Sequence, residues 1–256
     1  GLSLKVGPLG ENDRLLTILS EKEGISRIAI PGGRRPKSSL AAASPLTFLE
    51  LQVTGKSELK RVRQMKILRS FSKLGESIET LAAAQALTEL TLMLVGKDDP
   101  QPNILNTILI HLERLERKEN SSENQNLVLA KSIQSCIHLL AFGGYCIPIQ
   151  RCCYSGVDLI PPLGSWEWRC SFNPEDGFAI GSFDNSKIEL NPSELALLQR
   201  LLRPNLPIDK NGNLIGPKDV WLKLLSIIEY WINSNLSRKV HSLGILREAI
   251  ISSHYQ

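Results

Sequence analysis

Apolar and polar residues alternate along the first seventy positions, and this two-residue period predicts five short β-strands. In the first strand, Leu2, Leu4 and Val6 alternate with Ser3 and Lys5. Further strands are expected at residues 15–19, 24–30, 48–53 and 59–68. A sheet this small avoids exposed edges by closing on itself. We therefore predict a small closed barrel over residues 1–71, for which the oligonucleotide-binding (OB) barrel is the obvious candidate.

From about residue 72 the apolar period changes to about 3.6 residues, which predicts an all-α domain. The expected helices are residues 78–94, a helix that follows Pro102, residues 127–142, a helix after Asn191, residues 218–235 and a last one around residues 243–250. Residues 146–189 show little periodicity and interrupt this pattern. The fold class expected is α+β and multidomain: a barrel (1–71), a helical domain (72–145 and 190–256) and an irregular insert (146–189).

Composition places the chain among globular proteins of the cytoplasm. Of its 256 residues, 42% are apolar and 22% are charged, which are ordinary values for a soluble protein. There is no apolar run long enough to span a bilayer and no visible signal peptide. Five cysteines are an odd number in a chain without an export signal, so we expect reduced thiols in a reducing cytosol.

Positive charge is concentrated in the predicted barrel. Residues 1–70 contain thirteen Lys and Arg against six Asp and Glu, a net charge of +7, whereas the remainder carries seventeen against twenty, a net charge of −3. A basic domain indicates a polyanionic partner, and nucleic acid is favoured over an anionic membrane. A solvated basic surface is the alternative. The candidate DNA-binding residues are Arg34, Arg35, Lys37, Lys56, Lys60, Arg61, Arg63 and Lys66.

The fifth predicted strand is unusual because its cations fall on both faces of the pleat. Lys60, Arg61, Arg63, Lys66 and Arg69 occupy both phases of the two-residue period. One face of the strand has to cover the barrel interior. We therefore expect some of the long side chains to extend past the rim so that their charges reach water.

Several motifs, in this order, resemble the RecO family of recombination mediators. They are Pro8-Leu9-Gly10-Glu11-Asn12-Asp13-Arg14-Leu15, Glu21-Lys22-Glu23-Gly24, Gly33-Arg34-Arg35-Pro36-Lys37-Ser38, residues 137–145, Cys152-Cys153-Tyr154-Ser155-Gly156, Phe172-Asn173-Pro174-Glu175-Asp176-Gly177 and Arg238-Lys239-Val240-His241-Ser242-Leu243. Together they cover nearly the whole chain. No single motif is diagnostic, and the resemblance rests on the ordered set.

The resemblance implies a DNA repair protein without an active site. RecO proteins join an OB barrel to a helical domain, bind single- and double-stranded DNA and anneal complementary strands. They work with RecR to load RecA onto strands coated by single-strand binding protein (SSB), whose acidic C-terminal tail they also bind. For this chain we thus expect a nucleoid-associated bacterial protein. For the SSB tail, Lys131 is the nearby cation, because Gln134-Ser135-Cys136 replaces the family's Arg-x-Phe-Glu pattern.

A zinc knuckle is the second feature implied by the resemblance, and here the sequence departs from the family. Many RecO sequences have two Cys-x-x-Cys pairs, a spacing that suits tetrahedral zinc. Alignment on Gly156 leaves Cys152 at the first ligand position, puts Ser155 at the second, and places the later pair near Gly181 and Asp184. Cys152, Cys153 and Cys170, with His138 or a carboxylate, remain the weak metal candidates. We expect no cofactor, and an insert held by packing of Trp166, Trp168 and Phe172.

Catalysis finds little support in the sequence. The four histidines are scattered, and there is no His-Glu-x-x-His, phosphate-binding loop or Gly-x-Ser-x-Gly. His111 and His138 lie within predicted helices and are expected to be packed or partly exposed. Glu11 and Asp13 lie in a predicted turn, where structural or solvating roles are expected. The chain is therefore predicted not to be an enzyme. The alternative function is a scaffold that binds acidic protein tails and has little direct contact with DNA.

Overall fold

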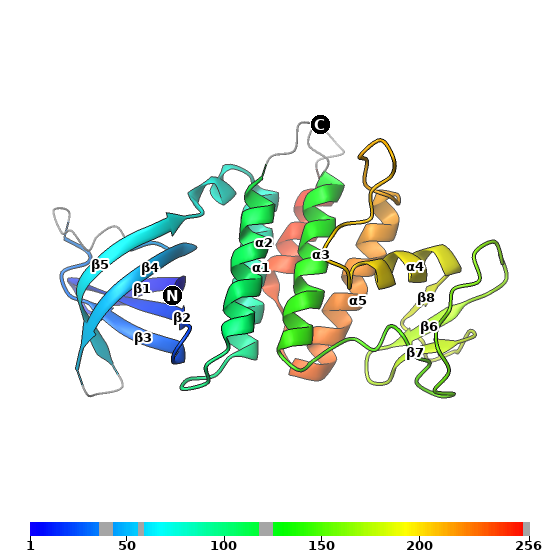
Figure 1. The fold of residues 1–256 in the computed structure, drawn as a ribbon, viewed down its shortest axis with the longest axis horizontal. Coiled ribbons are helices and arrows are strands. Elements are labelled where there is room, and N and C mark those ends of the chain that lie inside the picture. The colour runs from blue at the N-terminus through cyan, green and yellow to red at the C-terminus, as the bar shows by residue number, and fades with distance from the viewer. Residues whose placement is uncertain (36–42, 56–58, 118–124, 253–256) are drawn as a thin grey trace.

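The computed structural model describes residues 1–35, 43–55, 59–117 and 125–252. Its three parts follow one another along the long axis of the molecule (Figure 1). The barrel lies at one end, the helices lie in the middle, and a small sheet lies at the opposite end. The two ends of the molecule are thus formed by different parts of the chain.

The N-terminal part is the predicted closed OB barrel of five strands. They are β1 (Leu2–Leu9), β2 (Asp13–Ser20), β3 (Gly24–Ile30), β4 (Thr47–Thr54) and β5 (Lys60–Ser70). Their order around the barrel is β1-β2-β3-β5-β4. β3 and β5 pair in parallel, whereas the other neighbours are antiparallel. The interior is filled by Leu16, Ile18, Ile28, Ile30, Ala43, Leu49 and Val62.

Irregularities in the pairing of β4 with β5 explain how β5 carries so many cations. The register passes from Val53↔Val62 to Gln52↔Gln64, which leaves Arg63 as an extra residue in β5. Such a bulge shifts the alternation of side chains by one position. Val62 is accordingly buried and Met65 packs against the same interior. Arg61, Arg63 and Lys66 are all exposed. We expected long side chains to carry these charges past the rim into water, whereas in the structure the bulge accounts for their exposure.

One end of the barrel is docked on the helices. Barrel residues Leu2, Leu4 and Leu19 belong to the same apolar cluster as the helical core. At this junction the Ile25 N–H donates to the Gly96 carbonyl at 2.9 Å. Gly24 has a φ of +65°, and a Cβ there would lie 2.3 Å from the carbonyl oxygen of Asp99. Close backbone approach therefore requires glycine at this position.

The helical part contains six α-helices within the described residues. They are α1 (Ile78–Leu94), α2 (Pro102–Glu116), α3 (Gln125–Phe142), α4 (Pro192–Arg200), α5 (Lys218–Leu236) and α6 (His241–Ser252), and a short 3-10 helix (Ser72–Glu76) precedes them. The central helix α3 packs against α1, α2 and α5. α4 begins with the predicted cap, in which Asn191 and Glu194 bond each other's backbone amides. Among the described helices, none has the length and apolarity needed to cross a membrane.

The insert is more regular than its sequence pattern indicates. It contains an antiparallel sheet in the order β7-β6-β8, formed by β6 (Cys170–Asn173), β7 (Gly177–Ile180) and β8 (Ile188–Leu190). These strands have only three or four residues, which is too short for a clear period. Phe172 and Phe178 pack with ring centroids 4.9 Å apart, and Trp168 is partly buried. The expected packing role of Trp166 is wrong, because its side chain lies in solvent with 89% of the residue exposed.

The two histidines of the helical core bond to each other. His111 Nε2 lies 3.0 Å from His138 Nδ1, and His138 Nε2 lies 3.0 Å from the Leu201 carbonyl oxygen. Since the carbonyl accepts the proton of His138 Nε2, His138 Nδ1 accepts from His111. Burial, together with the charges of His138 and Arg114, lowers the pKa of His111 to about 3. The two histidines are thus packed in the core, where they form a hydrogen-bonded chain of neutral rings.

The docking contact predicts a specific effect of Gly24→Ala. The new Cβ requires an unfavourable positive φ and also meets the Asp99 carbonyl. The matched control is Gly10→Ala, because Gly10 has a φ of +60° with nothing within 4 Å of the added Cβ. In urea unfolding, Gly24→Ala should lose about 1–3 kcal/mol more stability than the control, the usual cost of overpacking. Equal losses would mean that this contact does not constrain the docking.

The buried histidine pair predicts a loss of stability in acid. In the unfolded chain a histidine titrates near its ordinary pKa of 6.5, whereas folded His111 titrates at about 3. The contribution of neutral His111 to the free energy of unfolding is therefore complete above pH 6.5 and declines as the pH falls toward 3. His111→Gln should reduce the slope of the unfolding free energy against pH by about 1.4 kcal/mol per pH unit, because the variant takes up one proton fewer on unfolding. The free energy of unfolding measured from pH 7 to 4 checks this, with the exposed His241→Gln as a control that should retain the slope.

Candidate nucleic-acid interface

The loop after β3 is a tight turn bonded to the β1–β2 turn. The Gly32 N–H donates to Asp13 Oδ1 at 2.8 Å, and the Arg34 N–H donates to the Asn12 carbonyl at 3.0 Å. Arg34 also donates from Nη1 to the carbonyl of Gly10 at 3.2 Å. Asp13 therefore has the structural role expected of it. Arg34 and Arg35 are exposed on an anchored loop, and Arg34 lines a groove of about 490 Å³ together with Arg14.

The pairing of β3 with β5 brings two sets of predicted residues to one end of the barrel. Ala29 of β3 is level with Arg61 of β5, and the two strands run in the same direction. The Arg34 loop leaves the end of β3 just past Ala29, while Arg63 lies two residues beyond Arg61. The closed barrel therefore gathers four of the predicted cations, Arg34, Arg35, Arg61 and Arg63, from segments 26 or more residues apart in the sequence.

Lys60 differs from the other predicted cations because it is engaged within the barrel. Its ammonium forms an ion pair with Glu23, and the side chain is only partly exposed. Hydrogen bonds from Lys60 and Ser26 lower the pKa of the Glu23 carboxyl. Lys60 thus has a local counter-charge, whereas Arg61 and Arg63 face solvent. Lys66 is also exposed and lies opposite Glu50 of β4.

Two further cations extend this surface and were missing from the sequence prediction. Lys5 pairs across the sheet with Thr17, and Thr17 pairs with Arg27, so the three side chains form a row over β1, β2 and β3. Lys5 and Arg27 are both exposed. Both occupy polar positions that alternate with apolar residues of their strands, and this pattern in the sequence could have identified them. We call the following exposed set the basic face: Lys5, Arg27, Arg34, Arg35, Arg61, Arg63 and Lys66.

The other predicted residues are not brought to the basic face. Lys37 and Lys56 lie outside the described residues. Lys131 lies within α3, is 5% exposed, and donates from Nζ to the Arg117 carbonyl at 3.4 Å. The sequence pattern suggested a surface cation at Lys131, but tertiary packing covers it. Its burial gives no support to a direct contact with an acidic tail.

Aromatic side chains contribute no platform to the barrel surface. Phe48 and Phe71 are the only aromatic residues in positions 1–71. Phe71 is buried with the Arg69 guanidinium 4.8 Å from its ring centroid, and Phe48 packs against the apolar cluster. Bases of a single strand commonly stack on exposed aromatic rings. The basic face offers charge instead, which is suited to phosphate.

The cysteine knuckle of the insert retains a turn that stabilises a thiolate. The Gly156 N–H donates to the Cys152 carbonyl at 2.9 Å and closes the turn. Burial opposes ionisation of the Cys152 thiol, but hydrogen bonds from the Ser155 hydroxyl and from the backbone amides of Ser155, Ile180 and Tyr154 outweigh it and lower the pKa to about 7. Cys170 behaves differently, since burial raises its pKa to about 12.

These residues do not fit the zinc site of the family. Ser155 stands at the second ligand position, and its hydroxyl bonds the Cys152 sulfur. Gly181, near the third position, has no side chain. His138 is bonded at both ring nitrogens. Within the described ranges, no three His, Cys, Asp or Glu side chains are grouped so that they could hold a metal ion. That this chain binds no zinc stays a prediction.

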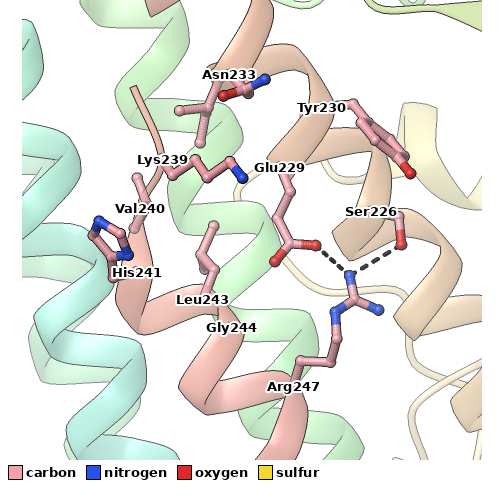
Figure 2. A pocket seen from close by; sticks show the side chains of 11 residues that line it. Ser226, Glu229, Tyr230, Asn233, Lys239, Val240, His241, Leu243, Gly244 and Arg247 are labelled. Carbon is pink, nitrogen blue, oxygen red and sulfur yellow. Dashed lines mark hydrogen bonds and ion pairs between the residues drawn. The ribbon is translucent and has the colours of Figure 1, made fainter. Parts of the chain in front are cut away.

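A second hollow lies between α5 and α6 and has a volume of about 580 Å³ (Figure 2). Arg247 is oriented toward Glu229 and Ser226, forming an ion pair with the carboxylate and a 3.0 Å hydrogen bond with Ser226 Oγ. The charge of Arg247 is thus balanced inside the hollow. Lys239, from the turn between the helices, is exposed at its rim.

Comparison with known proteins agrees with the fold and with the order of the motifs. The family described as "Recombination protein O N terminal" matches residues 1–71, and "Recombination protein O C terminal" matches residues 75–244. The DNA repair protein RecO of Prochlorococcus marinus strain MIT 9303 is 62% identical over 254 residues, which cover 99% of this chain and 95% of that protein.

More distant relatives carry the same description. DNA repair protein RecO of Synechococcus sp. strain WH7803 is 57% identical over 98% of this chain and 93% of that protein. The corresponding protein of Trichodesmium erythraeum strain IMS101 is 27% identical over 96% of this chain and 92% of its own length. A barrel joined to a helical domain thus defines a class of DNA repair and recombination proteins. The chain belongs to the RecO family.

The altered knuckle predicts that chelation has no effect on stability. Protein purified without added metal should contain far less than one zinc per chain, and its unfolding temperature should be the same with and without EDTA. Elemental analysis and thermal unfolding measure the two quantities. An equimolar zinc content, or a lower unfolding temperature in EDTA, would contradict the prediction that the chain binds no zinc.

Proposed function

We propose that this chain is a recombination mediator that binds single- and double-stranded DNA and anneals complementary strands. In this proposal it works with RecR to help load RecA onto SSB-coated single strands, and it acts by binding without catalysing a reaction. The observation that carries the proposal is the basic face. Its seven exposed cations lie on strands and an anchored loop of a closed barrel.

Phosphate recognition is the mode of binding that this face supports. Lys and Arg on a rigid sheet attract a backbone of either nucleic-acid form, because phosphates are common to both. A protein that holds backbones leaves the base edges free to pair. Annealing follows if two strands neutralised in this way approach more closely than bare strands do. The proposed site of action is the bacterial cytoplasm, at the nucleoid.

The protein partners rest on the family resemblance. RecR and the SSB tail are proposed as direct partners, and RecA is affected indirectly. Because Lys131 is buried, we propose no residue for the tail contact. A scaffold that binds acidic tails remains the competing function, and it would use exposed cations for protein instead of DNA. The two functions differ in whether the basic face determines affinity for DNA.

Charge removal on β5 should weaken DNA binding and reduce its dependence on salt. For Arg61→Gln/Arg63→Gln, the slope of log affinity against log salt should fall by roughly 0.7 per lost contact on single strands and roughly 0.9 on duplex. Fluorescence anisotropy with labelled oligonucleotides measures this slope. The control is Arg238→Gln/Lys239→Gln, which removes two exposed cations of the helical domain. Wild-type protein whose DNA affinity does not change with salt would favour the scaffold.

Annealing should depend on the same residues. A time course with two complementary labelled strands should be accelerated by the wild-type chain and by the Arg238→Gln/Lys239→Gln control. Arg61→Gln/Arg63→Gln should lose most of the acceleration, since fewer phosphates are neutralised. Full annealing by this variant would separate annealing from the basic face.

A further inference from the structure

Asp13 makes a side-chain hydrogen bond at the point where the backbone pairing of β2 with β3 ends. The last residue pair is Arg14↔Ile30, and the next residue of the chain, Pro31, has no N–H with which to continue the pairing. The Asp13 carboxylate instead accepts from the Gly32 N–H, with Oδ1 2.8 Å from the nitrogen. A side chain thus takes over the connection between the two strands.

This bond lies at the base of the Arg34 loop, by which we mean residues 31–35. Gly32 has a φ of +64°, and its carbonyl accepts from the Arg35 N–H at 2.9 Å, so the chain reverses in a tight turn. Both Arg34 and Arg35 are exposed just after this turn. The bond to Asp13 therefore fixes the segment from which the two arginines project.

Arg34 is held on the same β1–β2 turn by two further bonds. Its N–H donates to the Asn12 carbonyl at 3.0 Å, and its Nη1 donates to the Gly10 carbonyl at 3.2 Å. A guanidinium has five N–H donors, so one bond to a carbonyl leaves others for a phosphate. A side chain that is already ordered loses less entropy when it binds a ligand.

The charge of Asp13 opposes the effect of its hydrogen bond. A carboxylate repels a polyanion, so the charge of Asp13 by itself weakens the binding of DNA. Its bond to Gly32 favours binding if the arginines have to be held in place. Glu11 provides a comparison, because it is exposed on the same turn and has the same charge. Charge and position thus predict effects of opposite sign, which variants can separate.

We propose that Asp13 is a positioning residue for DNA binding. Through the Gly32 N–H it holds the Arg34 loop in the conformation that presents Arg34 and Arg35 to phosphates. This inference rests on the proposed function, since it requires that the basic face binds DNA. Without the bond, the two arginines would have to be ordered when DNA binds. Loss of Asp13 then weakens DNA binding although a negative charge has been removed.

Fluorescence anisotropy with a labelled single strand at low salt tests the proposal. Asp13→Ala removes the acceptor and should weaken binding at least about threefold, because two arginines have to be immobilised again. Asp13→Asn retains an oxygen acceptor and removes only the charge, so it should bind at least as tightly as wild type. Glu11→Ala removes an exposed carboxylate of the same turn, leaves the Gly32 bond intact, and should also bind at least as tightly.

The combination with Arg34→Gln/Arg35→Gln shows whether Asp13 acts through the loop. In that background, Asp13→Ala should cause no further loss of affinity, because the side chains that it positions are gone. Urea unfolding verifies that each variant is folded. If Asp13→Ala does not fold, amide hydrogen exchange of the wild type decides, because the Gly32 amide should be protected. Exchange of this amide at the rate of an unstructured chain would overturn the proposal.

Two other results would also contradict the positioning role: equal affinities of Asp13→Ala and Glu11→Ala, or an Asp13→Asn variant as weak as Asp13→Ala. The proposed function survives either result if Arg34→Gln/Arg35→Gln binds DNA less tightly than wild type. If that double variant binds as tightly as wild type, the loop does not contact DNA and the positioning role is wrong. The salt dependence of Arg61→Gln/Arg63→Gln then still tests the proposed function separately.

Discussion

Closure of the barrel through β3 and β5 is the constraint on which the surface of this protein depends. β3 ends at Ile30 and β5 begins at Lys60. Within the described residues, they are joined by two residue pairs, Ile28↔Lys60 and Ala29↔Arg61. Without this parallel pairing, β5 would be an edge strand with no fixed relation to the Arg34 loop. With it, cations from separate segments share one surface, and the Arg63 bulge keeps them in water while Val62 fills the interior.

The barrel is docked on the helices through a shared apolar cluster and a close backbone contact. An apolar cluster runs from β1 and β2 into the helical core, and the backbone at Gly24 approaches the α1–α2 turn too closely for any side chain. The molecule thus has a basic barrel at one end and an insert of net negative charge at the other (Figure 1).

Two histidines in the interior of the helical part are held as neutral rings. His111 and His138 form a chain of hydrogen bonds that ends on the Leu201 carbonyl. In the knuckle, backbone amides and the Ser155 hydroxyl bond the Cys152 sulfur. Such donors lower the pKa of the Cys152 thiol, because a hydrogen bond from an amide or a hydroxyl stabilises the thiolate form.

The sequence by itself determined the elements whose period is long and regular. The five strands, the helices and the cap at Asn191 were predictable, because each depends on contacts between residues close in the chain. Tertiary structure alone decided which cations meet, because register and the bulge at Arg63 depend on partner strands. It also buried Lys131, exposed Trp166 and paired His111 with His138, since burial depends on which elements pack together and not on local pattern.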